Sequence, residues 1–165
     1  MQKKTRVLFV CLGNICRSPL AEAIFKHKIK ERKLENFFEA ESCGTANYHI
    51  GETPDPRTIR NALKNGITIN HLGRQLCTAD FDEFDYIYVM DKSNHANALR
   101  LAKENQHTKV IMMRAFDTIG KGEDVPDPWS GGEEGFQEVF KILDRSMDQL
   151  VNKLSEGLTL ARQVL

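Results

Sequence analysis

The fold can be inferred from one stretch of thirteen residues, Val7-Leu8-Phe9-Val10-Cys11-Leu12-Gly13-Asn14-Ile15-Cys16-Arg17-Ser18-Pro19. Its first four residues are apolar without alternation, which is typical of a strand buried on both faces in a parallel sheet covered by helices. Proline is favoured in the first turn of a helix, and the residues after Pro19 are apolar at helical spacing. The stretch therefore predicts a buried strand that ends at Cys11, a short loop, and a helix that begins near Arg17.

The loop has the length and composition of an anion-binding site. Five residues separate Cys11 from Arg17, which is enough to form a tight ring whose backbone N–H groups point inward. Gly13 suits a position that needs a positive φ or a close approach to a ligand, and Asn14 is the next most tolerant residue. The partial positive charge at the N-terminus of the following helix also favours anions. We therefore expect a ring that accommodates a phosphate group.

Three side chains give this loop chemical reactivity. The helix N-terminus favours a thiolate, so Cys11 is expected to ionise readily and to act as a nucleophile. Arg17 provides a planar fork that matches two oxygens of a tetrahedral oxyanion, and Ser18 can donate a hydrogen bond to the cysteine sulfur. The alternative is a structural cysteine at a strand end, followed by a surface arginine. The buried strand, the Gly13-Asn14 pair and the helix start favour the functional interpretation.

The sequence from Cys11 to Pro19 resembles the signature phosphate-binding loop of the low-molecular-weight protein tyrosine phosphatases. The resemblance extends over nearly the whole chain, from near Arg6 to Leu154. It implies a flavodoxin-like α/β domain that hydrolyses phosphotyrosine and other aryl phosphates through a cysteinyl-phosphate intermediate, without a metal or cofactor. It makes Cys11 and Arg17 catalytic, and it implies that substrate is bound by Leu12, Gly13, Asn14, Ile15, Cys16 and Ser18.

The length and charge of the chain limit its expected number of domains, its partners and its location. The chain has 165 residues, and its 23 Lys and Arg are balanced by 23 Asp and Glu. This size is most simply a single domain, residues 1–165, with a C-terminal tail at residues 155–165. A balanced charge gives no electrostatic reason to expect nucleic acid or an anionic membrane surface as a partner. The apolar run after the basic N-terminal residues is short, so we expect a cytoplasmic protein without a signal peptide or membrane span.

The four cysteines follow neither the pattern of a secreted disulfide framework nor that of a zinc site. Cys11 and Cys16 flank the same loop. A reversible disulfide between them would shield the nucleophile from over-oxidation, and the sequence leaves this question open. The other two, Cys43 and Cys77, are far apart in the sequence.

The sequence predicts three further strands. Residues 37–42 alternate polar and apolar positions, and their charged face suggests the edge of a sheet. The apolar runs 86–90 and 109–113 predict buried strands. With the strand before Cys11, these match the fold class that the resemblance implies. That fold class is a three-layer, flavodoxin-like α/β fold in which a central four-stranded parallel sheet is flanked by helices. The loops that follow the strands are expected to converge at one end of the sheet.

Helices are expected between and after these strands. Asp55 caps a helix with Pro56 at its first position and Gly66 just past its end, and a short helix is expected over residues 78–84. Ser93 is expected to cap a third. The apolar stripe of the Asp55 helix is expected to consist of Ile59, Ala62 and Leu63.

The last helix is predicted from Phe136, with apolar residues at helical spacing up to Leu154. Gly157 is expected to break the tail after it. The apolar residues of that tail are expected to dock on the body of the protein or on a partner, and they are Leu158, Leu160, Val164 and Leu165.

The resemblance assigns roles to three residues outside the loop. It places Tyr48 in one wall of the substrate cleft, although the ring could equally pack on the surface. It places His71 in a hydrogen-bond network with Asn14, Ser18 and Ser42, which supports the phosphate-binding loop. An isolated histidine is otherwise most simply structural. Asp91 is interpreted as a helix-start carboxylate and is not included among the catalytic residues.

The general acid is expected in the loop before the last helix. This loop is long, rich in glycine and acidic, which is typical of a functional segment. Composition alone does not choose among its carboxylates, but Asp127 is flanked by two prolines that restrict its backbone. The family's general acid lies in the same Asp-Pro-aromatic setting. Many members carry adjacent tyrosines after Asp-Pro, whereas this chain has Trp129-Ser130, and Trp129 is expected to form another wall of the cleft.

Other functions remain as alternatives at this stage. An arsenate reductase on this scaffold needs two cysteines beyond the loop on a mobile segment, whereas after Cys43 this chain has only Cys77 and it retains Asp127. A protein arginine phosphatase carries threonine where this chain has Ile15, and the bulkier apolar Ile15 fits the tyrosine-type pattern. A phosphate-binding module without activity would not need both Cys11 and Asp127. The expected partner is a phosphotyrosine protein, with a tyrosine kinase as one candidate, and the chain is expected to be a monomer or weak dimer.

Overall fold

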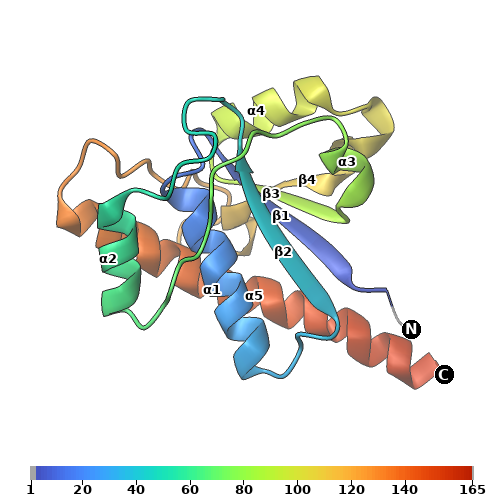
Figure 1. Ribbon diagram of the computed structural model, residues 1–165. Coiled ribbons are helices and arrows are strands. Elements are labelled where there is room, and N and C mark those ends of the chain that lie inside the picture. Colours follow the sequence, from blue (N-terminus) through green and yellow to red (C-terminus); the bar gives the residue numbers. More distant parts are fainter. Residues whose placement is uncertain (1–2, 165) are drawn as a thin grey trace.

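The computed structural model describes the backbone of residues 3–164 and the side chains of residues 3–158. Strands and helices alternate through most of the chain (Figure 1). In chain order they are β1 (Thr5–Cys11), α1 (Arg17–Glu31), β2 (Phe38–Gly44), α2 (Pro56–Lys64), α3 (Asp80–Glu83), β3 (Tyr86–Val89), α4 (Lys92–Leu101), the 3₁₀ helix η1 (Glu104–Lys109), β4 (Val110–Met112), the 3₁₀ helix η2 (Met113–Phe116) and α5 (Glu133–Val164).

The four strands form one parallel sheet in the order β2-β1-β3-β4. Helices α1 and α5 cover one face, and α3 and α4 cover the other, so the fold has three layers (Figure 1). β2 lies at an edge of the sheet, as its charged alternation predicts. The predicted fold class, a flavodoxin-like arrangement with a four-stranded parallel sheet, is confirmed.

The core lies on both faces of β1. Val7 and Phe9 pack in the cluster shared with α1 and α5, whereas Leu8 and Val10 pack in the cluster shared with α3 and α4. All four side chains are fully buried. Because successive residues of a strand point to opposite faces, a strand between two helical layers must be apolar at every position. This requirement explains the run without alternation.

Three local expectations were wrong. Leu63 is 64% exposed, because α2 turns Thr58, Asn61 and Ala62 inward instead. The cap of α4 is Asp91, whose carboxylate accepts a hydrogen bond from the Asn94 N–H at 2.7 Å, and Ser93 lies within the helix.

The chain does not break at Gly157, because α5 continues through it to Val164. Glycine lowers helix stability by only about 1 kcal/mol, and Leu154 and Leu158 on either side pack against the core. The side chains of Leu160 and Val164, and all of Leu165, lie outside the described residues.

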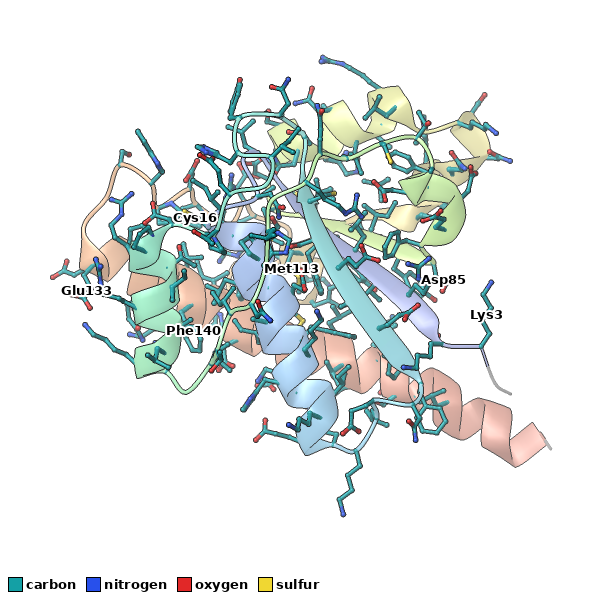
Figure 2. All side chains as sticks on the ribbon, viewed as in Figure 1. Lys3, Cys16, Asp85, Met113, Glu133 and Phe140 are labelled. Carbon is teal, nitrogen blue, oxygen red and sulfur yellow. The ribbon has the colours of Figure 1, made fainter. Side chains whose placement is uncertain are left out.

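The carboxyl ends of the strands define the functional end of the molecule. In Figure 2, Cys16 lies at the start of α1 beside these ends, whereas Lys3 and Asp85 lie at the opposite end of the sheet. The loops after β1 and β3 meet here, as open parallel sheets predict. Among the described residues, none of the helices has the length and hydropathy needed to cross a membrane.

Candidate active site

Cys11 is the last residue of β1, and its sulfur is held by two donors. The Asn14 N–H lies 3.3 Å from Sγ, and the Ser18 hydroxyl lies 2.9 Å from it. Both donors belong to the loop or to the first turn of α1. Cys11 is only 3% exposed, so these contacts replace most of its hydration.

The strained position in the loop is Asn14, not Gly13. Asn14 has a φ of 59°, a conformation that asparagine tolerates better than most residues. Gly13 does not have a positive φ, but it lies against the imidazole of His49. A Cβ added at Gly13 would lie 3.2 Å from His49 Cδ2. Glycine therefore serves close packing here, and asparagine provides the turn.

The side chain of Asn14 is the centre of a buried hydrogen-bond network. Its Nδ2 donates to Ser18 Oγ at 2.8 Å and to Ser42 Oγ at 3.1 Å, while its Oδ1 accepts from His71 Nε2 at 2.7 Å. Ser42 in turn donates to Glu22 Oε1 at 2.7 Å. The network ends at the Cys11 sulfur through Ser18. The structure thus brings together the four residues expected to support the loop, and it adds Glu22.

A close backbone contact holds the loop against β2. Gly44 is paired with Cys11 in the sheet register, and a Cβ added at Gly44 would lie 2.7 Å from the Leu12 oxygen and 3.1 Å from the Asn14 nitrogen. Both contacting atoms are backbone, so they have little room to move. The sequence showed this glycine but not its contact, since Gly44 and Leu12 are distant in the chain. Only glycine fits at this position.

Arg17 is the first residue of α1 and is 3% exposed. Its Nη1 donates to Asp91 Oδ2 at 2.7 Å and to the Val125 carbonyl at 2.9 Å. Asp91 therefore does more than cap α4: its other oxygen caps the helix while this one orients the guanidinium. The sequence-based interpretation of Asp91 as a helix-start carboxylate is confirmed, but its contact with Arg17 was not predicted.

Asp127 lies at the mouth of the same site. Its Oδ2 is 3.8 Å from Arg17 Nη2, and its Oδ1 accepts a hydrogen bond from the Trp129 N–H at 3.1 Å. The side chain is 48% exposed. This carboxylate is thus close to the guanidinium, but it remains open to solvent and to an incoming ligand.

The cleft above the loop has a volume of about 300 Å³. Two exposed aromatic rings, Tyr48 and Trp129, line it together with His49, which sequence reasoning did not single out. Asn14 and Ser18 do not line the cleft, because their side chains lie beneath the loop in the network described above. The remaining lining residues are Cys11, Leu12, Gly13, Ile15, Cys16, Arg17 and Asp127.

The other cysteines differ from Cys11 in their surroundings. Burial raises the pKa of the Cys16 thiol to about 12 and raises that of Cys43 well above its ordinary value. Cys77 is exposed. All four are free thiols. Within the described part of the chain, no group of three or more His, Cys, Asp and Glu side chains is arranged to hold a metal ion.

Comparison with known proteins identifies the family. The profile of the family described as low molecular weight phosphotyrosine protein phosphatase matches residues 6–160. The chain belongs to this family. A low molecular weight phosphotyrosine protein phosphatase from Schizosaccharomyces pombe is 44% identical over 152 residues, which cover 91% of this chain and 97% of that protein. One from Saccharomyces cerevisiae is 42% identical over 153 residues, covering 91% and 95%.

Solved structures agree with this assignment. The crystal structure of a protein tyrosine phosphatase from Entamoeba histolytica matches with a TM-score of 0.91 and 40% identity, covering 93% of this chain and 99% of that one. This low-molecular-weight tyrosine phosphatase is therefore an enzyme of the phosphotyrosine-hydrolysing class. Its phosphate-binding loop contains Cys11, as the sequence indicated.

The network beneath the loop makes this phosphatase's stability depend on pH. Burial lowers the pKa of His71 below its ordinary value of 6.5, although Glu22, with Oε1 3.4 Å from Nδ1, opposes this shift. The unfolded chain therefore takes up a proton near pH 6.5 while the folded chain does not. The contribution of the neutral His71 is complete above that pH and is lost as the pH falls from 6.5 toward the lower folded pKa.

In His71→Gln, the side-chain amide replaces the imidazole N–H as a donor and does not titrate. We expect this variant to weaken the dependence of the unfolding free energy on pH. Urea unfolding from about pH 7.5 to about pH 5.5 should show a smaller loss of unfolding free energy than in wild type. His107→Gln, on η1 and outside the network, is the matched control. An unchanged slope in His71→Gln would show that His71 does not cause the dependence.

Proposed function

We propose that this phosphatase hydrolyses phosphotyrosine and other aryl phosphates by double displacement, through a phosphoryl group carried on Cys11. One observation carries the proposal: a single cleft is lined by Cys11, Arg17 and Asp127. A nucleophile, an anion clamp and a carboxyl group are the three parts that metal-free phosphoryl transfer from an ester needs. The loop N–H groups and the Arg17 guanidinium hold the equatorial oxygens of phosphorus.

In the first step the Cys11 thiolate attacks phosphorus in line with the leaving oxygen. An S–P bond forms and the P–O bond to the aryl group breaks. Asp127, in its protonated form, gives its proton to the departing phenolate. Ser18 and the Asn14 N–H stabilise the thiolate before the attack, since both contact Sγ. The products are a phenol and a cysteinyl-phosphate.

In the second step a water molecule attacks the cysteinyl-phosphate. Asp127, now a carboxylate, takes a proton from that water as an O–P bond forms and the S–P bond breaks. Inorganic phosphate leaves, and Cys11 returns to the thiolate. Asp127 therefore acts as an acid in the first step and as a base in the second.

The cleft walls favour an aromatic leaving group. Tyr48 and Trp129 are both largely exposed, so each can stack on a flat ring that enters the cleft. The substrates we propose are phosphotyrosine side chains of proteins, including those of a tyrosine kinase. A monomer or weak dimer, a single domain over residues 1–165 and a cytoplasmic location remain predictions, and a protective Cys11–Cys16 disulfide remains an open question.

Asp91 is proposed to fix Arg17 for the phosphoryl group, and Asp91→Asn isolates this role. Asparagine also caps helices well, so α4 is retained while the charge that faces Arg17 is removed. A hydrogen bond between charged groups is worth about 1.5–3 kcal/mol, so kcat/KM should fall by about 10- to 100-fold. Asp55→Asn, which caps α2 and does not contact Arg17, is the matched control. Turnover equal to wild type in Asp91→Asn would remove Asp91 from the mechanism.

The substrate class separates this proposal from its alternatives. Purified, reduced enzyme is assayed with phosphotyrosine and phosphoarginine peptides and with arsenate plus thioredoxin. Preferred hydrolysis of phosphotyrosine is the expected result. Preference for phosphoarginine would contradict it, and so would arsenate reduction. The latter is disfavoured because Cys43, one of the two cysteines beyond the loop, is completely buried. Binding of phosphate without any turnover would support a silent module.

A further inference from the structure

Three charged residues form a buried cluster that the mechanism above does not use. Asp117 follows η2, and its side chain is completely buried. Arg114 Nε donates to Asp117 Oδ2 at 2.8 Å, and Arg145 Nε of α5 donates to Oδ1 at 2.6 Å. We call these three residues the loop-anchoring cluster. None of them lines the catalytic cleft.

Arg114 donates hydrogen bonds to the backbone of the loop that carries Asp127. Its Nη1 donates to the Asp124 carbonyl at 2.9 Å, and its Nη2 donates to the Ile119 carbonyl at 3.0 Å. Its own carbonyl accepts a hydrogen bond from the Gly122 N–H at 2.8 Å. The side chain therefore holds the loop at several points that are distant along the chain.

The loop is shaped around this arginine. Gly120 has a φ of 77°, and a Cβ added there would lie 2.3 Å from Arg114 Nη2. A side chain at this position would be strained in the backbone and would collide with the guanidinium. Asp117 also accepts a hydrogen bond from the Ile119 N–H at 3.0 Å. The start of the loop is thus built onto the cluster.

The anchored segment leads directly to the catalytic carboxyl group. One residue beyond Asp124, Val125 is fully buried, its N–H donates to the Met90 carbonyl at 2.7 Å, and its carbonyl accepts from Arg17. Asp124 Oδ1 accepts from the Lys92 N–H at 3.0 Å. Asp127 follows two residues after Val125, and prolines on both sides restrict its backbone. The positions of Asp124 and Val125 therefore determine where the Asp127 carboxyl group lies in the cleft.

Stability alone is a weak reason for such a cluster. Burying charges costs desolvation energy that their attraction only partly repays. α5 is already held to the rest of the protein by apolar packing and by Lys28 of α1, whose Nζ lies 2.9 Å from Asp144 and 2.7 Å from Asp148. What Arg114 adds is a set of donors directed at loop carbonyls.

We propose that Arg114, Asp117 and Arg145 are positioning residues that hold Asp127 at the leaving oxygen of the substrate. This inference rests on the proposed role of Asp127 as general acid. The cluster acts on the loop and not on Cys11, and Asp91 still orients Arg17 if the Val125 contact is weakened. Loss of the cluster therefore impairs proton donation more than phosphate binding. Misplacing a catalytic group by about 1 Å can cost about 100-fold in rate.

The leaving group reports this role. p-Nitrophenolate departs with little need for a proton, whereas phenolate needs one. Arg114→Met removes the donors and keeps an unbranched side chain of similar reach. We expect kcat for phenyl phosphate to fall by about 10- to 100-fold and the fall for p-nitrophenyl phosphate to be smaller. Competitive inhibition by inorganic phosphate should weaken by less than kcat for phenyl phosphate falls, because Asp91 still orients Arg17. Lys28→Met, which also breaks an ion pair to α5, is the matched control and should lower kcat for both substrates equally, if at all.

Combination with Asp127→Ala makes the test decisive. If the cluster acts through Asp127, then adding Arg114→Met to Asp127→Ala causes no further loss on phenyl phosphate. An equal loss with and without Asp127 would overturn the proposal, as would an equal loss on both substrates.

If Arg114→Met does not fold, Arg145→Met, at the more exposed end of the cluster, is measured in the same way. If Asp127→Ala itself shows no leaving-group dependence, the proposed role of Asp127 fails, which is a different result from failure of the cluster alone.

Discussion

Cys11→Ser should abolish turnover of p-nitrophenyl phosphate, with kcat reduced by at least about 10⁴-fold. Serine preserves the size of the side chain and its contacts with Ser18 and the Asn14 N–H. The serine hydroxyl does not ionise at working pH, however, so it cannot attack phosphorus and no covalent phosphoryl-enzyme forms. The loop and its anion site are retained. The variant should therefore still bind inorganic phosphate, measured by calorimetry, while it no longer turns over substrate.

Cys77→Ser is the matched control for this loss. Cys77 is an exposed, free thiol outside the cleft. Its replacement should leave kcat and KM unchanged. Substantial turnover by Cys11→Ser, or an equal loss in Cys77→Ser, would exclude Cys11 as the nucleophile.

Asp127→Ala should lower kcat for phenyl phosphate by about 10²- to 10⁴-fold, the usual contribution of a positioned general acid. The loss on p-nitrophenyl phosphate should be smaller, because its leaving group needs less protonation. Binding of phosphate should change little, since Asp127 approaches Arg17 only to 3.8 Å.

Glu134→Ala is the comparison for Asp127→Ala. Glu134 is another carboxylate of the same acidic region, and it is exposed at the start of α5. Its removal should have no effect on either substrate. A loss in Asp127→Ala that is the same for every leaving group would mean that this carboxylate does not donate the proton.

The fold was predictable because the local sequence pattern and the position of β1 in the sheet both call for apolar residues in this strand. Val7 to Val10 must be apolar at each position, since helices cover both faces of β1. The phosphate-binding loop was predictable because its parts are adjacent in the sequence. Cys11, Arg17 and Ser18 are brought together by one turn of loop and the start of α1.

Residues that act through distant contacts were not predictable in the same way. Asp91 contacts Arg17 across 74 positions of the chain, and Gly44 contacts the loop from the neighbouring strand. An aspartate before a helix has the same local pattern whether or not an arginine faces it. Arg114 and Arg145 likewise show no motif, because their partners are loop carbonyls and one buried carboxylate.

Two of the three wrong expectations, those for Leu63 and Gly157, have a common cause in tertiary packing. Leu63 suits a helix stripe, but α2 packs through Asn61, whose amide donates to Gln137 of α5 at 2.9 Å. Gly157 disfavours a helix locally, yet the packing of Leu154 and Leu158 outweighs this preference.

Direct detection of the phosphorylated enzyme tests the central claim. Enzyme turning over p-nitrophenyl phosphate in EDTA is quenched rapidly, digested and examined by mass spectrometry. Turnover should continue without metal, and one phosphoryl group should be found on the Cys11 sulfur of the peptide that contains this residue. A phosphoryl group on another residue would contradict the account, and so would activity that EDTA abolishes and a divalent cation restores.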